Sequence, residues 1–280
     1  MSVQSREANA PEGNVTRVEM RGGASWKLAL LGGLNTPRAK RVFTAAGMHE
    51  FVRDYRPGAS ESTARGLSRM LVTAGALRPV SSGLYLNLRA VPPAELTEAA
   101  AYLRAGAVIS LHSVLGECGF LNNPSTVVTA VLPTSAAKRP QLGEVKTSRD
   151  AVFRFHGLAE KFFPNSEGDQ WEMLQPGRAC ATFRPEAALL QWLHLAGMKR
   201  SRLTLPPLDV DMEQLDQELL NRLAAKWGLV DQLGVWLGRA QAAQFGEQQV
   251  AAQTAEAPTA EAIASSDAAR ARLMSRRKSS

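Results

Sequence analysis

Residues 25–88 hold three helical patterns followed directly by a hairpin pattern, and this order constrains the fold more than any other feature of the chain. Apolar residues between Trp26 and Leu34 predict a first helix, which ends before Pro37. The segment from Ala76 to Leu88 alternates apolar and polar residues around Ser81-Ser82-Gly83, as in a two-stranded hairpin. Three helices and a glycine-tipped hairpin in one compact stretch predict a winged helix-turn-helix.

The second and third helices have caps that can be recognised in the sequence. Thr44 is placed to cap a helix whose inner side chains are Met48, Phe51, Val52 and Tyr55. Ser60 is placed to cap the third helix, with Glu61 in its first turn. The spacing predicts that the buried stripe of this third helix consists of Ala64, Leu67, Met70, Leu71 and Ala74.

The opposite side of the third helix carries the side-chain types that read DNA in the major groove. We expect Ser62, Thr63, Arg65, Ser68 and Arg69 to face outward there. An arginine can form two hydrogen bonds with O6 and N7 of guanine, while serine and threonine reach phosphates or base edges. Lys40 and Arg41 ahead of the second helix, and Ser81 and Ser82 at the hairpin tip, complete the predicted DNA-binding set.

The charge distribution agrees with a polyanion partner at this end of the chain. The net charge of the whole chain is +7, and up to Ala90 it has 13 Lys and Arg against 6 Asp and Glu. The remaining residues hold 20 of each sign, so the first segment carries the entire excess. We therefore expect the residues up to about Arg89 to be sufficient for binding double-stranded DNA.

The chain is predicted to have four parts. Residues 1–23 are a polar, flexible arm, residues 24–90 are the winged helix-turn-helix, and residues 91–240 are a second domain. Residues 241–280 are a low-complexity tail that is predicted to be disordered, with room for helix in parts of it but little core. In the second domain we expect a helix from Glu95, three strands between Val127 and Leu158, a helix after Pro185, and one longer helix from Met212 to Trp236. The predicted fold class is α+β with a helical end.

These residues resemble the AbiEi antitoxins of bacterial type IV toxin–antitoxin pairs. The matching pieces occur in the order of that family and are Gly83-Leu84-Tyr85, Ile109–Leu115, Gly119-Phe120-Leu121, Val127–Pro133, Phe153–His156 and Pro185–Leu190. The chain departs from the family pattern at Ala187, where a basic residue is usual, and at Gln191, where an acid is usual.

The resemblance implies a DNA-binding N-terminal domain that represses its own operon at inverted repeats. It also implies a C-terminal domain that counteracts a co-encoded nucleotidyltransferase-like toxin without holding it in a tight complex. Glu186, in the Pro-Glu helix, is the candidate residue for this antitoxin function. The alternative is a winged-helix transcriptional regulator of the same fold that has no toxin partner.

A metal-dependent nuclease is a more remote alternative. Glu144-Val145-Lys146, with Asp150 nearby, has the acid and lysine spacing of such enzymes, but no acidic partner precedes it in a strand. No other catalytic or phosphate-loop motif is present, so we expect no enzymatic activity, cofactor or metal. Cys118 and Cys180 lack metal or redox spacing, and no apolar run reaches the roughly 18 residues of a membrane helix, which favours a cytoplasmic protein.

Overall fold

The computed structural model describes residues 25–122, 125–135, 141–147, 151–199 and 201–256. The predicted arm (1–23), the last part of the predicted tail (257–280) and Asp150 lie outside these residues. The chain divides into two compact units, Met1–Ala94 and Glu95–Ser280, and the break predicted after residue 90 falls just before this boundary.

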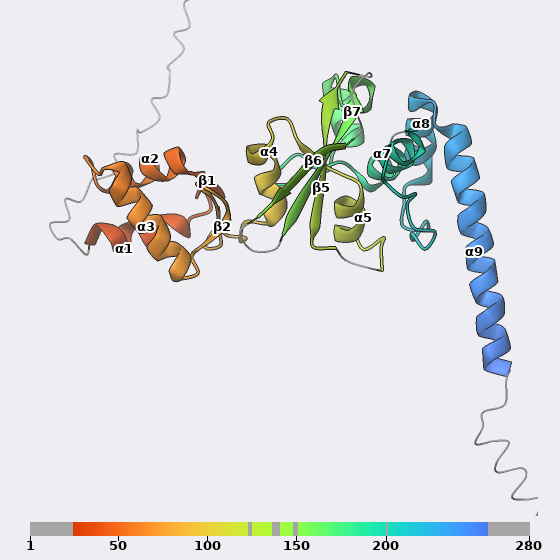
Figure 1. The fold of residues 1–280 in the computed structure, drawn as a ribbon, viewed down its shortest axis with the longest axis horizontal. Coiled ribbons are helices and arrows are strands. Elements are labelled where there is room, and N and C mark those ends of the chain that lie inside the picture. The colour runs from red at the N-terminus through yellow and green to blue at the C-terminus, as the bar shows by residue number, and fades with distance from the viewer. Residues whose placement is uncertain (1–24, 123–124, 136–140, 148–150, 200, 257–280) are drawn as a thin grey trace, which may run out of the picture. The chain divides into compact units, whose positions relative to one another are not determined.

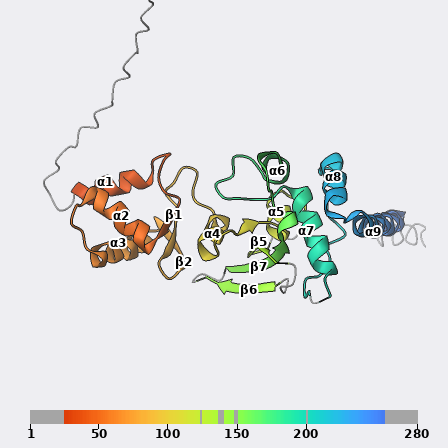
Figure 2. The same ribbon diagram turned by 90° about the horizontal axis from the view of Figure 1, so that it is seen from above.

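The first unit combines three helices with a small antiparallel sheet. Its elements in chain order are α1 (Ser25–Leu34), β1 (Val42–Thr44), α2 (Ala45–Tyr55), α3 (Glu61–Thr73), β2 (Leu77–Ser81) and β3 (Leu84–Asn87). The sheet order is β1-β3-β2, with both pairings antiparallel. The sequence predicted the three helices and the β2–β3 hairpin but not β1, whose three residues are too few for a recognisable pattern. In both views the helices lie on one side of the strands (Figure 1, Figure 2).

Capping side chains define where α2 and α3 begin. The Thr44 hydroxyl accepts a hydrogen bond from the Gly47 amide, and the Ser60 hydroxyl accepts one from the Thr63 amide. Both caps were predicted, because each satisfies an amide that the first helical turn leaves without a carbonyl. One apolar cluster then joins the helices to the sheet; its largest buried members are Leu30, Leu34, Phe43, Met48, Val52, Leu71 and Leu77.

The second unit contains a four-stranded sheet and a group of helices. Its elements are η1 (Leu96–Ala99), α4 (Ala100–Leu103), β4 (Val108–Ile109), α5 (His112–Glu117), β5 (Val127–Thr134), β6 (Gln141–Lys146), β7 (Val152–Ala159), η2 (Glu160–Phe162), α6 (Glu167–Met173), α7 (Pro185–Gly197), α8 (Gln217–Trp227) and α9 (Val230–Glu256). The strand order is β4-β5-β7-β6, in which only β5 and β7 are parallel. Helices and strands thus mix in the chain, and the predicted α+β class is confirmed.

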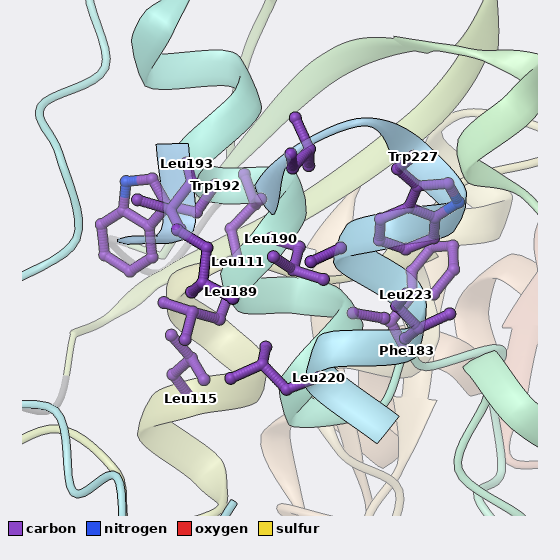
Figure 3. Packing of buried hydrophobic residues seen from close by; sticks show 14 of the residues in the cluster. Leu111, Leu115, Phe183, Leu189, Leu190, Trp192, Leu193, Leu220, Leu223 and Trp227 are labelled. Carbon is purple, nitrogen blue, oxygen red and sulfur yellow. The ribbon is translucent and has the colours of Figure 1, made fainter. Parts of the chain in front are cut away.

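Helix α7 is the centre of this unit. Its residues from Glu186 to Leu193 are all buried, which requires neighbours on every side of the helix. Leu111 and Leu115 pack against it from the side of α5, and Leu220, Leu223 and Trp227 pack from α8 (Figure 3). Gln191 is also fully buried; its side chain accepts a hydrogen bond from the Ser110 hydroxyl and donates one to the Phe162 carbonyl.

The single long helix expected from Met212 to Trp236 is wrong, because the structure has two helices there. Gly228 adopts the left-handed conformation (φ 71°, ψ 40°) that ends α8, and α9 begins at Val230. A glycine at this position has no side chain to clash in that conformation, so it is a strong helix stop. Helix α9 continues to Glu256, so residues 241–256 of the segment predicted as a disordered tail are helical.

His156, on β7, is a buried base with no hydrogen-bond partner for Nε2 within the described residues. Burial of the ring, reinforced by the positive charge of Arg154, lowers the pKa of His156 from 6.5 to about 4. The unfolded chain therefore binds a proton between pH 6.5 and 4 that the folded chain does not bind. Stability is fully retained above pH 6.5 and falls as the pH drops towards 4.

We expect this single group to remove about 3 kcal/mol of unfolding free energy between pH 7.5 and 4. The variant His156→Gln has no titrating group at this position. Between pH 7.5 and 4 its unfolding free energy should therefore fall by about 3 kcal/mol less than that of the wild type. Four of the five tryptophans lie in the second unit, so urea unfolding followed by tryptophan fluorescence reports on it. Parallel pH dependences for the two proteins would contradict the assignment.

Candidate nucleic-acid interface

Helix α3 presents one continuous surface to solvent. Its outer face is defined here by six exposed residues: Ser62, Arg65, Gly66, Arg69, Met70 and Thr73. Within the described residues the guanidinium groups of Arg65 and Arg69 form no hydrogen bond or ion pair, so both keep all five donors for a ligand. The hydroxyls of Ser62 and Thr63 lie 2.8 and 3.1 Å from the Ser60 hydroxyl, at the helix start. Thr63 is only half-exposed.

Three positions on α3 were predicted on the wrong side. Ser68 is 3% exposed, and its hydroxyl donates to the Ala64 carbonyl at 2.9 Å, so it is not available to DNA. Met70 is 41% exposed and Ala74 is also exposed, although both were expected in the buried stripe. The stripe is formed by Ala64, Leu67, Ser68 and Leu71.

The error has a simple geometric cause. Successive residues of a helix are rotated by about 100°, so positions four apart remain on nearly the same side. Ser68 lies four residues after Ala64 and next to Leu67, which places it with the core side chains. From residue type, the polar Ser68 was expected to be exposed and the apolar Met70 to be buried. Their positions around the helix give the reverse: Ser68 is buried and Met70 is exposed.

Lys40 and Arg41 have different surroundings, although both were predicted to contact phosphates. Lys40 is exposed and lies 3.5 Å from Glu50, in an ion pair that solvent screens. The Arg41 guanidinium donates to the carbonyls of Pro92 and Pro93, at 2.6 and 3.0 Å. Arg41 therefore holds the end of the first unit, and of these two residues Lys40 stays the candidate for a phosphate contact.

The hairpin tip contributes hydroxyl groups without charge. Ser82 is exposed in the turn between β2 and β3, and Ser81 is half-buried at the end of β2. These residues can donate to phosphate oxygens but add little electrostatic attraction. Residues 25–94 as a whole hold ten Lys and Arg against three Asp and Glu, so the charge excess predicted from the sequence also belongs to the described part of this unit.

Asn87 was missed by sequence reasoning and organises the base of the hairpin. Its side chain is completely buried, and Nδ2 donates to the carbonyls of Leu34 and Lys40, each at 3.0 Å. Its Oδ1 accepts from the Arg89 amide. One side chain thus ties the end of α1 and the segment before β1 to strand β3. Asparagine is unfavourable in strands, so its place at the end of an apolar strand was the available signal.

The described residues of the proposed nuclease motif, Glu144 and Lys146, do not form a metal site, and Asp150 lies outside the described residues. Glu144 of the edge strand β6 is paired with Arg154 of the neighbouring strand β7 at 2.6 Å, and both side chains are partly exposed. Among the residues that the structure describes, no three His, Cys, Asp or Glu side chains gather as metal ligands would. The nuclease hypothesis has no structural support in this part of the chain.

Glu186 is a buried residue that connects two helices of the second unit. It is 5% exposed, and its Oε1 accepts a hydrogen bond from the Asp216 amide at 2.9 Å. Asp216 is itself the N-cap of α8, where its carboxylate accepts from the Leu219 amide. Glu186 therefore holds the start of α8 against the start of α7, and it is not exposed to a partner.

This contact predicts different results for two substitutions at Glu186. In Glu186→Gln the amide oxygen can still accept from Asp216, so unfolding free energy should change by less than about 1 kcal/mol. Glu186→Ala removes the acceptor and leaves a cavity, which should cost about 1–3 kcal/mol. Urea unfolding of the two variants measures the difference, and equal destabilisation by both would show that the negative charge matters rather than the hydrogen bond.

None of the described helices is long and apolar enough to cross a bilayer.

No family model matches the chain, and no curated protein matches it. Three chains of solved structures match it. One is the RV2827C protein from Mycobacterium tuberculosis, with 18% sequence identity and a TM-score of 0.44 over 78% of this chain and 80% of that chain. Similarity at this level carries no argument about a site or a function.

Proposed function

We propose that this chain is a winged helix-turn-helix protein that binds double-stranded DNA and represses transcription of its own operon. We further propose that its second unit counteracts a co-encoded nucleotidyltransferase-like toxin. We propose no catalytic activity, cofactor or metal for the chain.

The observation that supports DNA binding is that the guanidinium groups of Arg65 and Arg69, on the outer face of α3, have no partner among the described residues. Arginine side chains on a protein surface often pair with carboxylates, and here neither does so within the described residues. The two lie four residues apart, so they point to the same side and can reach neighbouring base pairs of one major groove. The capped start of α3 and its buried stripe hold this face rigidly.

Other residues of the first unit support the same placement of α3 in the major groove of DNA. Antiparallel strands β2 and β3 follow α3 directly, as the wing follows the recognition helix in winged-helix proteins. Ser82 at the tip and Lys40 before α2 are exposed and suited to phosphate oxygens, which position a protein without specifying sequence. The excess of positive charge in residues 25–94 attracts any duplex.

The antitoxin half rests on the resemblance to AbiEi proteins alone. Of its distinguishing positions, Ala187 and Gln191 are buried in the core around α7, and Glu186 is bonded to the start of α8. These residues brace the second unit, so any contact surface for a toxin or its target must lie elsewhere on that unit. A regulator of the same fold without a toxin remains the alternative, and the presence of a toxin gene beside this one distinguishes the two.

A reporter gene placed behind the DNA upstream of this chain's own gene tests repression. The full chain should silence the reporter, and the double variant Arg65→Ala with Arg69→Ala should restore its expression at equal protein level. The same double variant, coexpressed with the neighbouring toxin candidate, should still rescue growth, because the second unit is intact. Unrepressed expression with the wild-type chain would refute autorepression, and loss of rescue in the double variant would refute the separation of the two activities.

A further inference from the structure

The glycine on the outer face of α3 has no explanation within the fold. Gly66 lies in the interior of α3, where glycine is among the least favourable residues. A side-chain carbon built at this position meets no atom within 4 Å, and the backbone is ordinary α-helix. The protein alone would therefore be more stable with alanine here.

Space for a side chain does not by itself single out this glycine. Gly32, Gly234 and Gly238 are also helical and equally open. Gly66 differs in its surroundings, because it directly follows Arg65 and lies one turn from Arg69, on the face that carries both guanidinium groups. By contrast, a side-chain carbon at Gly33 of α1 would lie 1.9 Å from the Tyr55 hydroxyl, so the Tyr55 side chain would have to move.

Met70 extends the same surface with an apolar group. It lies four residues after Gly66 and is 41% exposed, although the other residues of the outer face are polar or glycine. A position four residues on is the neighbour along the helix surface, so Gly66 and Met70 form one short apolar strip beside the row of Arg65 and Arg69. Methionine is flexible and adapts well to apolar partners.

We propose that this strip reads a thymine, with the bare backbone at Gly66 admitting a base edge close to the helix axis and the Met70 thioether packing on the thymine C5-methyl. Thymine is the only base that presents a methyl group in the major groove. Arginines beside the strip would select guanine at adjacent positions, so the strip adds a contact that hydrogen bonding cannot supply. This inference rests on the proposed binding of double-stranded DNA.

The variant Gly66→Ala separates a functional glycine from a tolerated one, because its two effects have opposite signs. Its midpoint of thermal unfolding should rise by a few degrees, since alanine favours the helix. Its affinity for the duplex upstream of its own gene should fall at least tenfold. The matched control Gly238→Ala, on α9, should gain stability and bind like the wild type. Unchanged affinity of Gly66→Ala for a duplex that the wild type binds would overturn the inference.

The methyl contact is tested by replacing each thymine of the bound duplex in turn with deoxyuridine, which removes only that methyl. At one position in each half-site the wild type should lose about fourfold in affinity, the scale of one buried methyl group. Met70→Ala should lose similar affinity on the thymine duplex and become insensitive to deoxyuridine, whereas Leu28→Ala, which removes another exposed apolar side chain from the same unit, should behave as the wild type.

The outcomes distinguish this inference from the function on which it rests. If the wild type binds the duplex but no deoxyuridine position weakens it, the thymine contact is refuted while DNA binding stands. A thymine effect that Met70→Ala retains would assign the methyl to another residue and refute the role of Met70. If the wild type binds no duplex at all, both the proposed function and this inference fail.

Discussion

Arg65→Ala and Arg69→Ala should each weaken binding to the duplex upstream of this chain's own gene by roughly 5- to 150-fold. That range corresponds to the 1–3 kcal/mol of one bidentate contact between arginine and guanine. Binding to a shuffled duplex should fall less, because only the attraction of one charge is lost there. Fluorescence anisotropy with labelled duplexes measures both affinities.

Two further variants show whether the contact or the charge is responsible. Arg69→Lys keeps the charge but removes the planar pair of donors, so it should lose most of the preference for the upstream duplex. Arg53→Ala, which removes an exposed charge of α2 that lies beside Glu50 and Asp54, should weaken both duplexes slightly and equally. Equal losses on both duplexes for all these variants would show that the outer face of α3 does not read sequence.

Asn87→Ala should destabilise the first unit by about 3–5 kcal/mol, the largest stability effect that we expect. The substitution takes the donor from the buried Leu34 carbonyl and the partly buried Lys40 carbonyl, and it removes the acceptor of the partly buried Arg89 amide. Each buried polar group that loses its partner costs about 1–3 kcal/mol. Hydrogen exchange of the α1 and β3 amides, measured by mass spectrometry, reports this unit separately from the second.

Asn87→Asp tests the direction of the hydrogen bonds. A carboxylate keeps the size of the side chain but faces two carbonyl oxygens with no proton to donate, so it should be at least as damaging as alanine at neutral pH. Asn35→Ala, at an exposed position just after α1, serves as the control and should exchange like the wild type. Mild effects of both Asn87 substitutions would mean that the hairpin base is held by its backbone pairing alone.

The sequence was sufficient to predict those elements whose structure depends on interactions between neighbouring residues. Thr44 and Ser60 cap helices for reasons that act within four residues, and the glycine at the hairpin turn acts just as locally, so α2, α3 and the β2–β3 hairpin could be predicted. The exposed positions of Arg65 and Arg69 followed from the same helical pattern.

Features that depend on distant partners could not be predicted. Strand β1 exists because Val42–Thr44 pairs with β3, about forty residues later in the chain. Arg41 binds the carbonyls of Pro92 and Pro93, and Glu186 binds the amide of Asp216, so neither role is visible from neighbouring residues. Ser68 was misplaced because a polar residue type was given more weight than its position beside Ala64 and Leu67.

The most direct test of DNA recognition is the affinity of the full chain for its upstream duplex and for a shuffled duplex, measured across a series of salt concentrations. We predict tighter binding to the upstream duplex by at least about a thousandfold at physiological salt. The logarithm of affinity should fall linearly with the logarithm of salt concentration, with a slope of about −0.9 for each phosphate neutralised. Equal affinities for the two duplexes at every salt concentration would contradict sequence-specific recognition by this chain.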